Sequence, residues 1–382
     1  MDFLNLIWTE FGVRAAFSFI FILSVIVFVH EMGHYLIARY NDVRVDVFSI
    51  GFGPELFGWD GKNGTRWKVG ALPLGGYVKM FGDANAASQP GAEIREMSEE
   101  EKRVSFHHKR LGQRAAVVFG GPLANFVLAI VILAGLFATV GQRITPADIT
   151  MVKPGSAAEA AGIQPGDVVL RIDDRKIERF EDIQRIVRKS AGVPLKIVVR
   201  RGDEEISLLA TPHAIEKIDR FGTVQRYGEL GVGRTGVIFV RLDPLTATWV
   251  ATSETFKLTA ATVKAIGQMI AGTRGSEDLG GPIRIAKVAG QVAEDGMITV
   301  FWFMAVLSIN LGLINLFPVP MLDGGHLLFY AFEAVRGRPL GERAQEYGFR
   351  IGIAMVVTLM VFATWNDLVQ LKVVDFFVKL FS

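Results

Sequence analysis

The residues with the clearest chemical potential lie in one short stretch, His30-Glu31-Met32-Gly33-His34. On a helix, residues four apart share a face, so His30 and His34 are placed to offer one ring nitrogen each to a single metal ion. Glu31 lies beside them, within reach of a proton on a water molecule that such an ion activates. The spacing therefore predicts a zinc-dependent hydrolytic site.

The motif lies near the end of an apolar segment, whose opening from Ala15 to Val29 carries no charge. A charged side chain at the centre of a membrane helix costs about 2.5–3.5 kcal/mol on insertion scales, so ionisable groups there are usually functional. The alternative is an ordinary helix that carries two surface histidines. The apolar setting favours the metal site.

A catalytic zinc requires a third protein ligand and an open position. The chain has no cysteine, so that ligand must be a histidine, an aspartate or a glutamate. We expect it to be Asp323, which follows an apolar segment and two prolines and precedes two glycines. This pattern predicts irregular backbone, which at membrane depth is tolerated only around a protein-lined cavity. His326 is the alternative ligand, or a donor that stabilises an oxyanion.

Long apolar stretches must position these residues. Half of the chain is apolar and its mean hydropathy is +0.34, which is high for a soluble protein of 382 residues. Such a bias usually comes from a few spanning segments rather than from one large core. We expect four transmembrane helices: Ala15 to about Ala38, Ala115 to Val140, about Met297 to Phe317, and about Ile351 to Trp365.

Basic residues near the ends of these segments predict their direction, because loops rich in lysine and arginine stay in the cytoplasm. They follow the first segment, precede the second, and lie between the third and the fourth. The termini and residues 142–296 are then expected on the other side. The first and third segments would run in the same direction, which brings the H-E-x-x-H motif and Asp323 to a similar depth. The basic residues are Arg39, Arg44, Lys102, Arg103, Lys109, Arg110, Arg114, Arg336, Arg338, Arg343 and Arg350.

Between the first two segments, residues 43–48, 66–69 and 77–81 have the composition of short strands among glycines. They predict a β-hairpin or small sheet that lies against the membrane. Further along, residues 245–272 are amphipathic, with Lys257 and Lys264 interrupting the apolar pattern, and we expect them to lie along the membrane surface.

The segment from Met151 to Asp173 predicts a strand, a short helix, a Gly-Ile-Gln-Pro-Gly-Asp turn and an alternating strand. With the helix and two strands expected after it, it resembles a PDZ domain of the type found in bacterial envelope proteases. PDZ domains bind extended peptides by adding a strand at a sheet edge. The alternative is a spacer domain whose groove binds nothing.

Several motifs together resemble the site-2 protease family of intramembrane zinc metalloproteases, and the bacterial RseP type in particular. They are the HEMGH motif, the stretch NLFPVPMLDGGH that ends at His326, and the intervening PDZ-like segment. The resemblance extends to GFGP at Gly51–Pro54, PLGGYVKM at Pro73–Met80 and GGPLANF at Gly120–Phe126. The enterobacterial members carry two PDZ domains, whereas this chain has room for one.

The resemblance implies a role for individual residues. His30, His34 and Asp323 would be zinc ligands, with Zn²⁺ as the cofactor, and Glu31 would be the catalytic base. The strands between Gly51 and Met80 would hold the substrate as an added strand. The residues implied in substrate binding are Asn315, Gly121, Asn125, Gly75, Gly76 and Tyr77.

The expected fold is therefore a polytopic α-helical membrane protein with about four transmembrane helices. It has a membrane-associated β-hairpin or sheet, and an α+β PDZ domain is inserted between spans two and three. The predicted segments are the first helix (1–40), the cytoplasmic loop (41–114), the second helix (115–141), the periplasmic PDZ domain (142–215), a periplasmic linker with the amphipathic helix (216–296), the third helix with the LDGGH loop (297–326), and the remainder with the fourth helix (327–382).

By resemblance, the chain is an inner-membrane endopeptidase that cleaves transmembrane segments during regulated intramembrane proteolysis. Its expected partners are the bilayer, peptide C-termini at the PDZ domain, and single-span proteins such as anti-sigma factors after a first extracytoplasmic cut. Remnant signal peptides are a second expected substrate class. Nucleic acid is not an expected partner, because the net charge is only +2 and no long basic run is present.

Two alternative interpretations of these motifs assign the chain to other functional classes. One is a catalytically idle scaffold that recruits partners through the PDZ domain, which predicts an incomplete metal triad. The other is a transporter or metal carrier, whose family commonly shows paired repeats that this sequence lacks. Glu31 between the two histidines has a role only in hydrolysis, which favours the protease.

Overall fold

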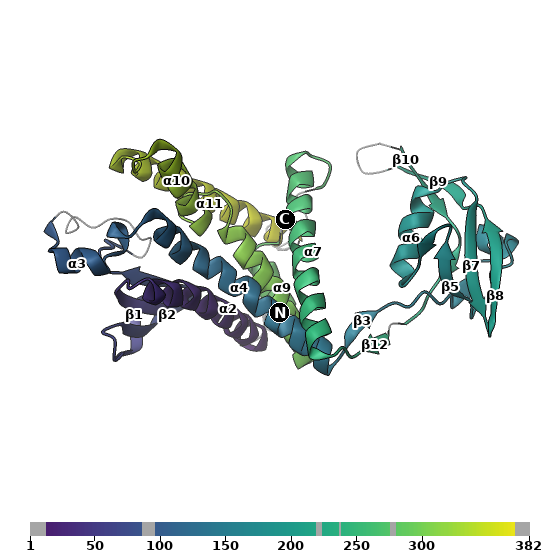
Figure 1. Ribbon diagram of the computed structural model, residues 1–382, viewed down its shortest axis with the longest axis horizontal. Coiled ribbons are helices and arrows are strands. Elements are labelled where there is room, and N and C mark those ends of the chain that lie inside the picture. The colour runs from purple at the N-terminus through teal and green to yellow at the C-terminus, as the bar shows by residue number, and fades with distance from the viewer. Residues whose placement is uncertain (1–12, 86–95, 219–223, 237, 276–279, 371–382) are drawn as a thin grey trace, which may run out of the picture. The chain divides into compact units, whose positions relative to one another are not determined.

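The structure, a computed structural model, describes residues 13–85, 96–218, 224–236, 238–275 and 280–370 (Figure 1). The chain forms two compact units. The first combines Met1–Gly135 with Leu245–Ser382, and the second is Leu136–Pro244.

Long apolar helices dominate the first unit. Among the described residues, four helices have the length and composition needed to cross a membrane, which confirms the number expected from the sequence. They are α2 (Val13–Tyr40), α4 (Leu111–Thr139), α9 (Met297–Asn315) and α11 (Glu342–Gln370).

Small residues allow α2, α4 and α9 to lie side by side (Figure 1). A Cβ atom added to Gly33 of α2 would lie 2.2 Å from the carbonyl oxygen of Gly120 on α4, so the two backbones touch at this point. Further along α4, the Ser308 hydroxyl of α9 donates a hydrogen bond to the carbonyl of Asn125 over 2.8 Å. Glycine and serine are typical of such close contacts between membrane helices.

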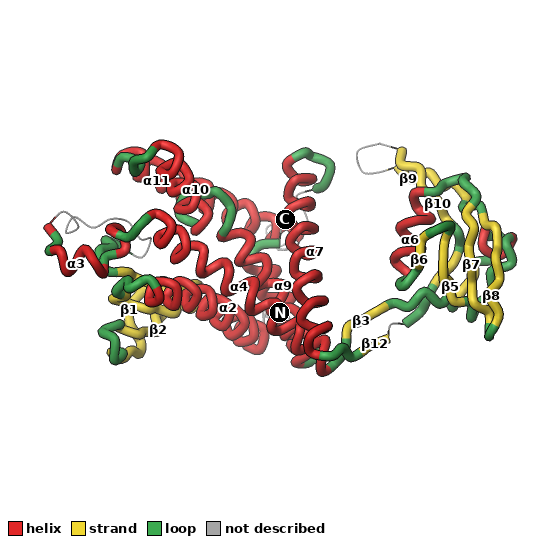
Figure 2. The backbone as a smooth tube through the Cα atoms, in the orientation of Figure 1, coloured by secondary structure: helices red, strands yellow, loops and turns green. Residues whose placement is uncertain are grey.

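A β-hairpin packs against the end of α2 that carries the H-E-x-x-H motif (Figure 2). Its strands β1 (Val45–Asp60) and β2 (Arg66–Met80) are longer than the short strands predicted, and several bulges bend them. The buried Phe48 ring lies 5.9 Å from the ring of Tyr35 on α2. This aromatic contact fixes the hairpin to the motif helix.

The remaining helices connect these elements. Asp367 of α11 accepts hydrogen bonds from the backbone N–H groups of Gly281 and Arg284, so it caps the start of α8. Thr262 of α7 donates to the side-chain oxygen of Asn310 on α9 over 3.2 Å. That α7 lies along the membrane surface stays a prediction. The bounds are α3 (Glu99–Val104), the 3₁₀ helix η2 (Phe106–His108), α7 (Pro244–Ile270), α8 (Pro282–Glu294) and α10 (Asp323–Arg336).

In its described residues, the second unit contains short strands and two short helices. Its largest sheet has four strands in the order β6-β5-β7-β8. The remaining strands pair two by two: β9 with β10, β4 with β11, and β3 with β12. The strands are β3 (Gln142–Ile144), β4 (Met151–Val152), β5 (Val168–Ile172), β6 (Arg175–Lys176), β7 (Leu195–Arg201), β8 (Glu204–Ala210), β9 (His213–Ile218), β10 (Val224–Glu229), β11 (Val232–Gly233) and β12 (Ile238–Val240), and the helices are α5 (Ala157–Ala160) and α6 (Phe180–Lys189).

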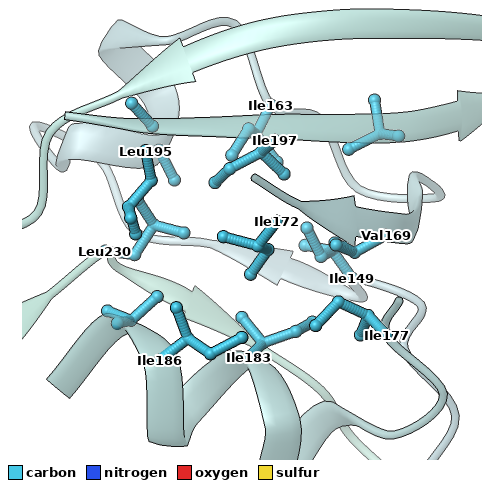
Figure 3. Close-up of a cluster of buried hydrophobic side chains, with 14 of the residues drawn as sticks. Ile149, Ile163, Val169, Ile172, Ile177, Ile183, Ile186, Leu195, Ile197 and Leu230 are labelled. Atoms are coloured by element: carbon cyan, nitrogen blue, oxygen red, sulfur yellow. The ribbon is translucent and has the colours of Figure 1, made fainter. Parts of the chain in front are cut away.

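One core holds the second unit together (Figure 3). Ile172 and Ile197 project from the sheet towards Ile183 on α6, and all three are buried. Leu230, which lies between β10 and β11, belongs to the same core. The unit therefore extends beyond residue 215, the predicted end of the PDZ domain. The compact unit is longer than the predicted PDZ segment because β11 pairs with β4, a contact between segments far apart in the chain.

A buried ion pair supports the turn before β5. The Asp167 side chain is buried and accepts two hydrogen bonds from Arg201, at 2.7 and 2.8 Å. Burial alone would raise the pKa of the Asp167 carboxyl, but the hydrogen bonds from Arg201 and from the Gln164 N–H outweigh it and hold this pKa below its usual value.

Candidate metal centre

The structure brings the three predicted metal ligands together. His30 and His34 lie one turn apart on α2, and Asp323 is the first residue of α10. One potential ligand atom from each lies within 4.8 Å of the others. They form the only such group of three or more histidine, aspartate or glutamate residues in the described part of the chain.

The separations match a tetrahedral zinc site. Nε2 of His30 lies 3.2 Å from Nε2 of His34 and 3.2 Å from Oδ2 of Asp323. Nε2 of His34 lies 3.4 Å from Oδ1 of Asp323. A tetrahedral zinc with ligands at about 2.0–2.1 Å places neighbouring ligand atoms about 3.3–3.4 Å apart. Oδ2 of Asp323 is buried without a hydrogen-bond partner among the described residues, so the donor set fits a zinc ion.

Asp323 reaches the site because α9 ends at Asn315, ahead of two prolines. The expectation of irregular backbone at Asp323 is wrong, since α10 begins there. The two following glycines allow close packing against the preceding loop. A Cβ on Gly324 would lie 2.3 Å from the carbonyl oxygen of Leu316, and one on Gly325 would lie 2.4 Å from that of Val319.

His326 is not part of the ligand group in the described residues. Its ring lies 5.4 Å from that of Phe349, in a partly buried position. The alternative of His326 as a metal ligand therefore finds no support in this geometry.

Helix α4 contacts the outer nitrogens of both histidines. Nδ1 of His34 donates to the carbonyl oxygen of Val117 over 2.9 Å, which leaves Nε2 free to bind a metal. The side-chain amide of Asn125 lies 3.2 Å from Nδ1 of His30. A Cβ added to Gly121 would lie 2.3 Å from Nε2 of His34, so only glycine leaves room for the His34 ring here.

The hairpin passes directly beside the predicted base. Glu31 is 8% exposed. A Cβ added to Gly76 of β2 would lie 3.1 Å from Cγ of Glu31 and 2.7 Å from the carbonyl oxygen of Ser49. Gly75 has φ +102°, a conformation that favours glycine. Tyr77 stacks on Phe52, with ring centroids 5.9 Å apart, rather than on the ligands.

Asn315, the last residue of α9, completes the inner face of the site. Its side-chain nitrogen lies 3.3 Å from Nε2 of His30, on the side where a metal would bind. The residues predicted from the sequence thus meet around one point, with Gly75 and Tyr77 one residue further out on β2. The contact that the sequence could not reveal is the Val117 carbonyl, because any residue type supplies a backbone oxygen.

Comparison with known proteins gives the family. The model of peptidase family M50 matches residues 18–359, most of the chain. The chain belongs to peptidase family M50. A protein of Agrobacterium fabrum named as a zinc metalloprotease is 47% identical over 358 residues, which cover 92% of this chain and 95% of that one. Metalloprotease MmpA of Caulobacter vibrioides is 39% identical, with 96% and 98% covered.

Family M50 consists of site-2 proteases, so this chain is a zinc metalloprotease and a multi-pass membrane protein. A solved structure, the PDZ domain of an SdrC-like protein from Listeria monocytogenes, covers 24% of this chain and 90% of its own length. Its sequence identity is 20% and its TM-score 0.18. So low a score leaves the fold of the second unit to be argued from its own strands.

Proposed function

We propose that this member of family M50 cleaves peptide bonds inside the transmembrane segments of other membrane proteins. His30, His34 and Asp323 hold the zinc ion, and Glu31 is the catalytic base. The observation that carries the proposal is the meeting of these three ligand atoms within 4.8 Å, on helices that are long and apolar enough to span a membrane.

The residues around the site divide the chemistry of hydrolysis between them. A bound zinc makes water nucleophilic at neutral pH and polarises a carbonyl group. Glu31 takes the proton from the attacking water and delivers it to the leaving nitrogen, so that the peptide C–N bond breaks. The Asn315 amide, 3.3 Å from Nε2 of His30, donates a hydrogen bond to the carbonyl oxygen of the scissile bond.

A transmembrane helix must unwind before it can be cut, because its amides are closed within the helix. The strand β2 passes against Glu31 at Gly76, and an unwound segment that pairs with this strand would lie beside the base. The far end of the hairpin exposes apolar side chains, as expected for a surface in contact with lipid. They are Phe52, Leu56, Phe57, Trp59 and Leu72.

The chain is proposed to lie in the inner membrane. The basic residues near the helix ends support a cytoplasmic location for residues 41–114 and for the connection between α10 and α11. The second unit and both termini would be periplasmic. The H-E-x-x-H motif near the end of α2 would then lie close to the cytoplasm, which shortens the path that water must take.

The second unit is proposed to be a PDZ domain that binds the C-terminus of a peptide. Helix α6 and the segment from Tyr227 to Val232 line a pocket of about 310 Å³. Val232 begins β11, whose pairing with β4 occupies one edge of that strand. A peptide added between β11 and α6 would extend the pairing and place its end near Gly231, whose φ is +83°.

The proposed substrates are single-span proteins that have already lost most of their extracytoplasmic part. Anti-sigma factor-like regulators after a first cut, and remnant signal peptides, are of this kind. Cutting the remaining span would release a cytoplasmic fragment, as in regulated intramembrane proteolysis. The new C-terminus left by the first cut is the chemical group that a PDZ domain would recognise.

The test compares purified wild-type protein with Glu31→Gln, which keeps the size of the side chain. Bound zinc and cleavage of a single-span model substrate are measured on the same samples. We expect about one zinc per chain in both proteins and cleavage by the wild type only. Zinc in the wild type without cleavage of any span, shortened ones included, would favour a metal carrier or scaffold. Equal cleavage by both proteins would exclude Glu31 as the base.

A further inference from the structure

Asn125 of α4 has a buried amide whose two ends differ in their surroundings. The residue is 0% exposed, and its Oδ1 has no hydrogen-bond partner among the described residues. Its Nδ2 lies 3.2 Å from Nδ1 of His30, the ring nitrogen that faces away from Asp323. An amide fits its site equally well after a 180° rotation that exchanges these two atoms, because oxygen and nitrogen have nearly the same size.

The two orientations have opposite consequences for His30. If Nδ2 faces the ring, Nδ1 must accept, and the ring proton sits on Nε2. That proton would point between His34 and Asp323 and would exclude a metal. If Oδ1 faces the ring, Nδ1–H donates to it, and Nε2 offers its lone pair to the metal. Since the other end of the amide has no partner, the hydrogen bond to His30 decides the orientation.

We propose that Asn125 is a positioning residue, whose Oδ1 accepts a hydrogen bond from Nδ1–H of His30 and so directs Nε2 towards the zinc. This proposal rests on His30 being a zinc ligand, as in the proposed function. It differs from the substrate contact that the sequence implied for Asn125, because the residue faces the outer nitrogen of a ligand.

Two further contacts support this role. The Ser308 hydroxyl of α9 donates to the carbonyl of Asn125, and a Cβ added to Gly312 would lie 3.3 Å from Cβ of Asn125, so α9 holds this residue in place. Val117, just over two turns earlier on the same face of α4, accepts from Nδ1 of His34 over 2.9 Å. Helix α4 would therefore orient both histidines of α2 in the same way.

The experiment measures zinc affinity in detergent by competition with a chromophoric chelator. The three informative variants are Asn125→Leu, Asn125→Asp and Asn315→Leu. Asn125→Leu keeps the volume and removes the acceptor, so we expect the Kd for zinc to rise about 10–100-fold. Asn125→Asp offers only acceptors and should bind zinc at least as tightly as the wild type. Asn315→Leu is the matched control, because Asn315 also contacts His30 but on the metal side; it should lose cleavage and keep zinc affinity.

The outcomes separate this proposal from the proposed function. Asp323→Asn removes a ligand and must weaken zinc binding strongly; if it does not, the metal site itself is misassigned. If Asp323→Asn weakens binding while Asn125→Leu matches the wild type, only the role of Asn125 fails. If Asn125→Asp binds as poorly as Asn125→Leu, the amide acts as a donor or a packing residue and the proposal is overturned.

A second measurement uses the wild type alone and so remains decisive if the variants fail to fold. The chain has only six histidines, which makes selective ¹⁵N labelling of their rings practical. In the zinc-loaded protein, we expect both metal-bound rings to carry their proton on Nδ1, one donating to Val117 and the other to Asn125. A metal-bound ring that is not protonated on Nδ1 would contradict the proposal.

Discussion

At the residue scale, the chemistry depends on small residues as much as on reactive ones. The histidines and the aspartate could be predicted from their types and spacing, since few side chains bind zinc and the chain has no cysteine. The need for glycine at position 121 could not be derived from spacing, because it follows from how closely α4 approaches His34. The sequence resemblance pointed to Gly121 without giving this reason.

Gly121→Ala is therefore expected to displace the His34 ring, because the new Cβ would lie 2.3 Å from Nε2. We expect zinc affinity to fall at least about tenfold and cleavage to fall with it, as measured by chelator competition and a substrate assay. Gly135→Ala is the matched control on the same helix, where an added Cβ meets nothing within 4 Å. Unchanged zinc affinity in Gly121→Ala would show that α2 and α4 can move apart to accept the new Cβ without weakening the metal site.

At the element scale, the hairpin and α10 show where pattern-based prediction stops. Alternating residues predicted strands around Phe48 and Tyr77, but the prolines and glycines between them concealed that β1 and β2 are continuous. The same residue types around Gly324 and Gly325 predicted irregular backbone, whereas the structure has the first turn of α10 packed against the preceding loop. In both places tertiary contacts override local preference.

Gly76→Val tests whether β2 presents the substrate. The new side chain would press against Ser49 and Val27, so β2 must move away from Glu31. We expect kcat/KM for a span substrate to fall about 100-fold while zinc content stays at the wild-type level, because the ligands lie on other elements. Lys62→Ala, in the turn between the strands, should behave as the wild type. A loss of zinc in Gly76→Val would show that the hairpin supports the metal site instead.

The ion pair of the second unit predicts a pH dependence of stability. The Asp167 carboxyl has a lowered pKa in the folded state, so its contribution is complete above the unfolded value of about 3.9 and is lost as pH falls through the folded value. For residues 136–244 expressed alone, Asp167→Asn should lower the urea midpoint at pH 7, and this difference should shrink below about pH 4.

Two observations would contradict this pH prediction. One is a difference in urea midpoint between the wild type and Asp167→Asn that stays constant down to about pH 2, which lies below the ordinary pKa range of aspartate. The other is a difference that grows as the solution is acidified. Glu178→Gln is the control, because Glu178 pairs with Lys176 at an exposed site and should not change the midpoint.

At the scale of the whole molecule, the pattern of apolar segments was sufficient to predict four candidate spans. The end of the second unit was not predictable, since the pairing of β11 with β4 joins segments that no local pattern connects. Membrane orientation rests on the basic residues alone and is open to direct measurement.

The absence of cysteine makes that measurement simple, because every introduced cysteine is then unique. Asp203→Cys lies on the exposed β7–β8 turn of the second unit, and Arg338→Cys lies in the exposed connection after α10. In intact cells stripped of their outer membrane, an impermeant maleimide should label Asp203→Cys. It should label Arg338→Cys only after lysis. Labelling of Arg338→Cys before lysis would reverse the proposed orientation.

The most direct test of intramembrane proteolysis is the position of the cut. A single-span substrate is incubated with the wild type or with Glu31→Gln, and both fragments are identified by intact-mass spectrometry. We expect one cut within the apolar segment, made only by the wild type and abolished when zinc is chelated. A cut confined to the polar flanks of the span, or one that persists in Glu31→Gln, would contradict this expectation.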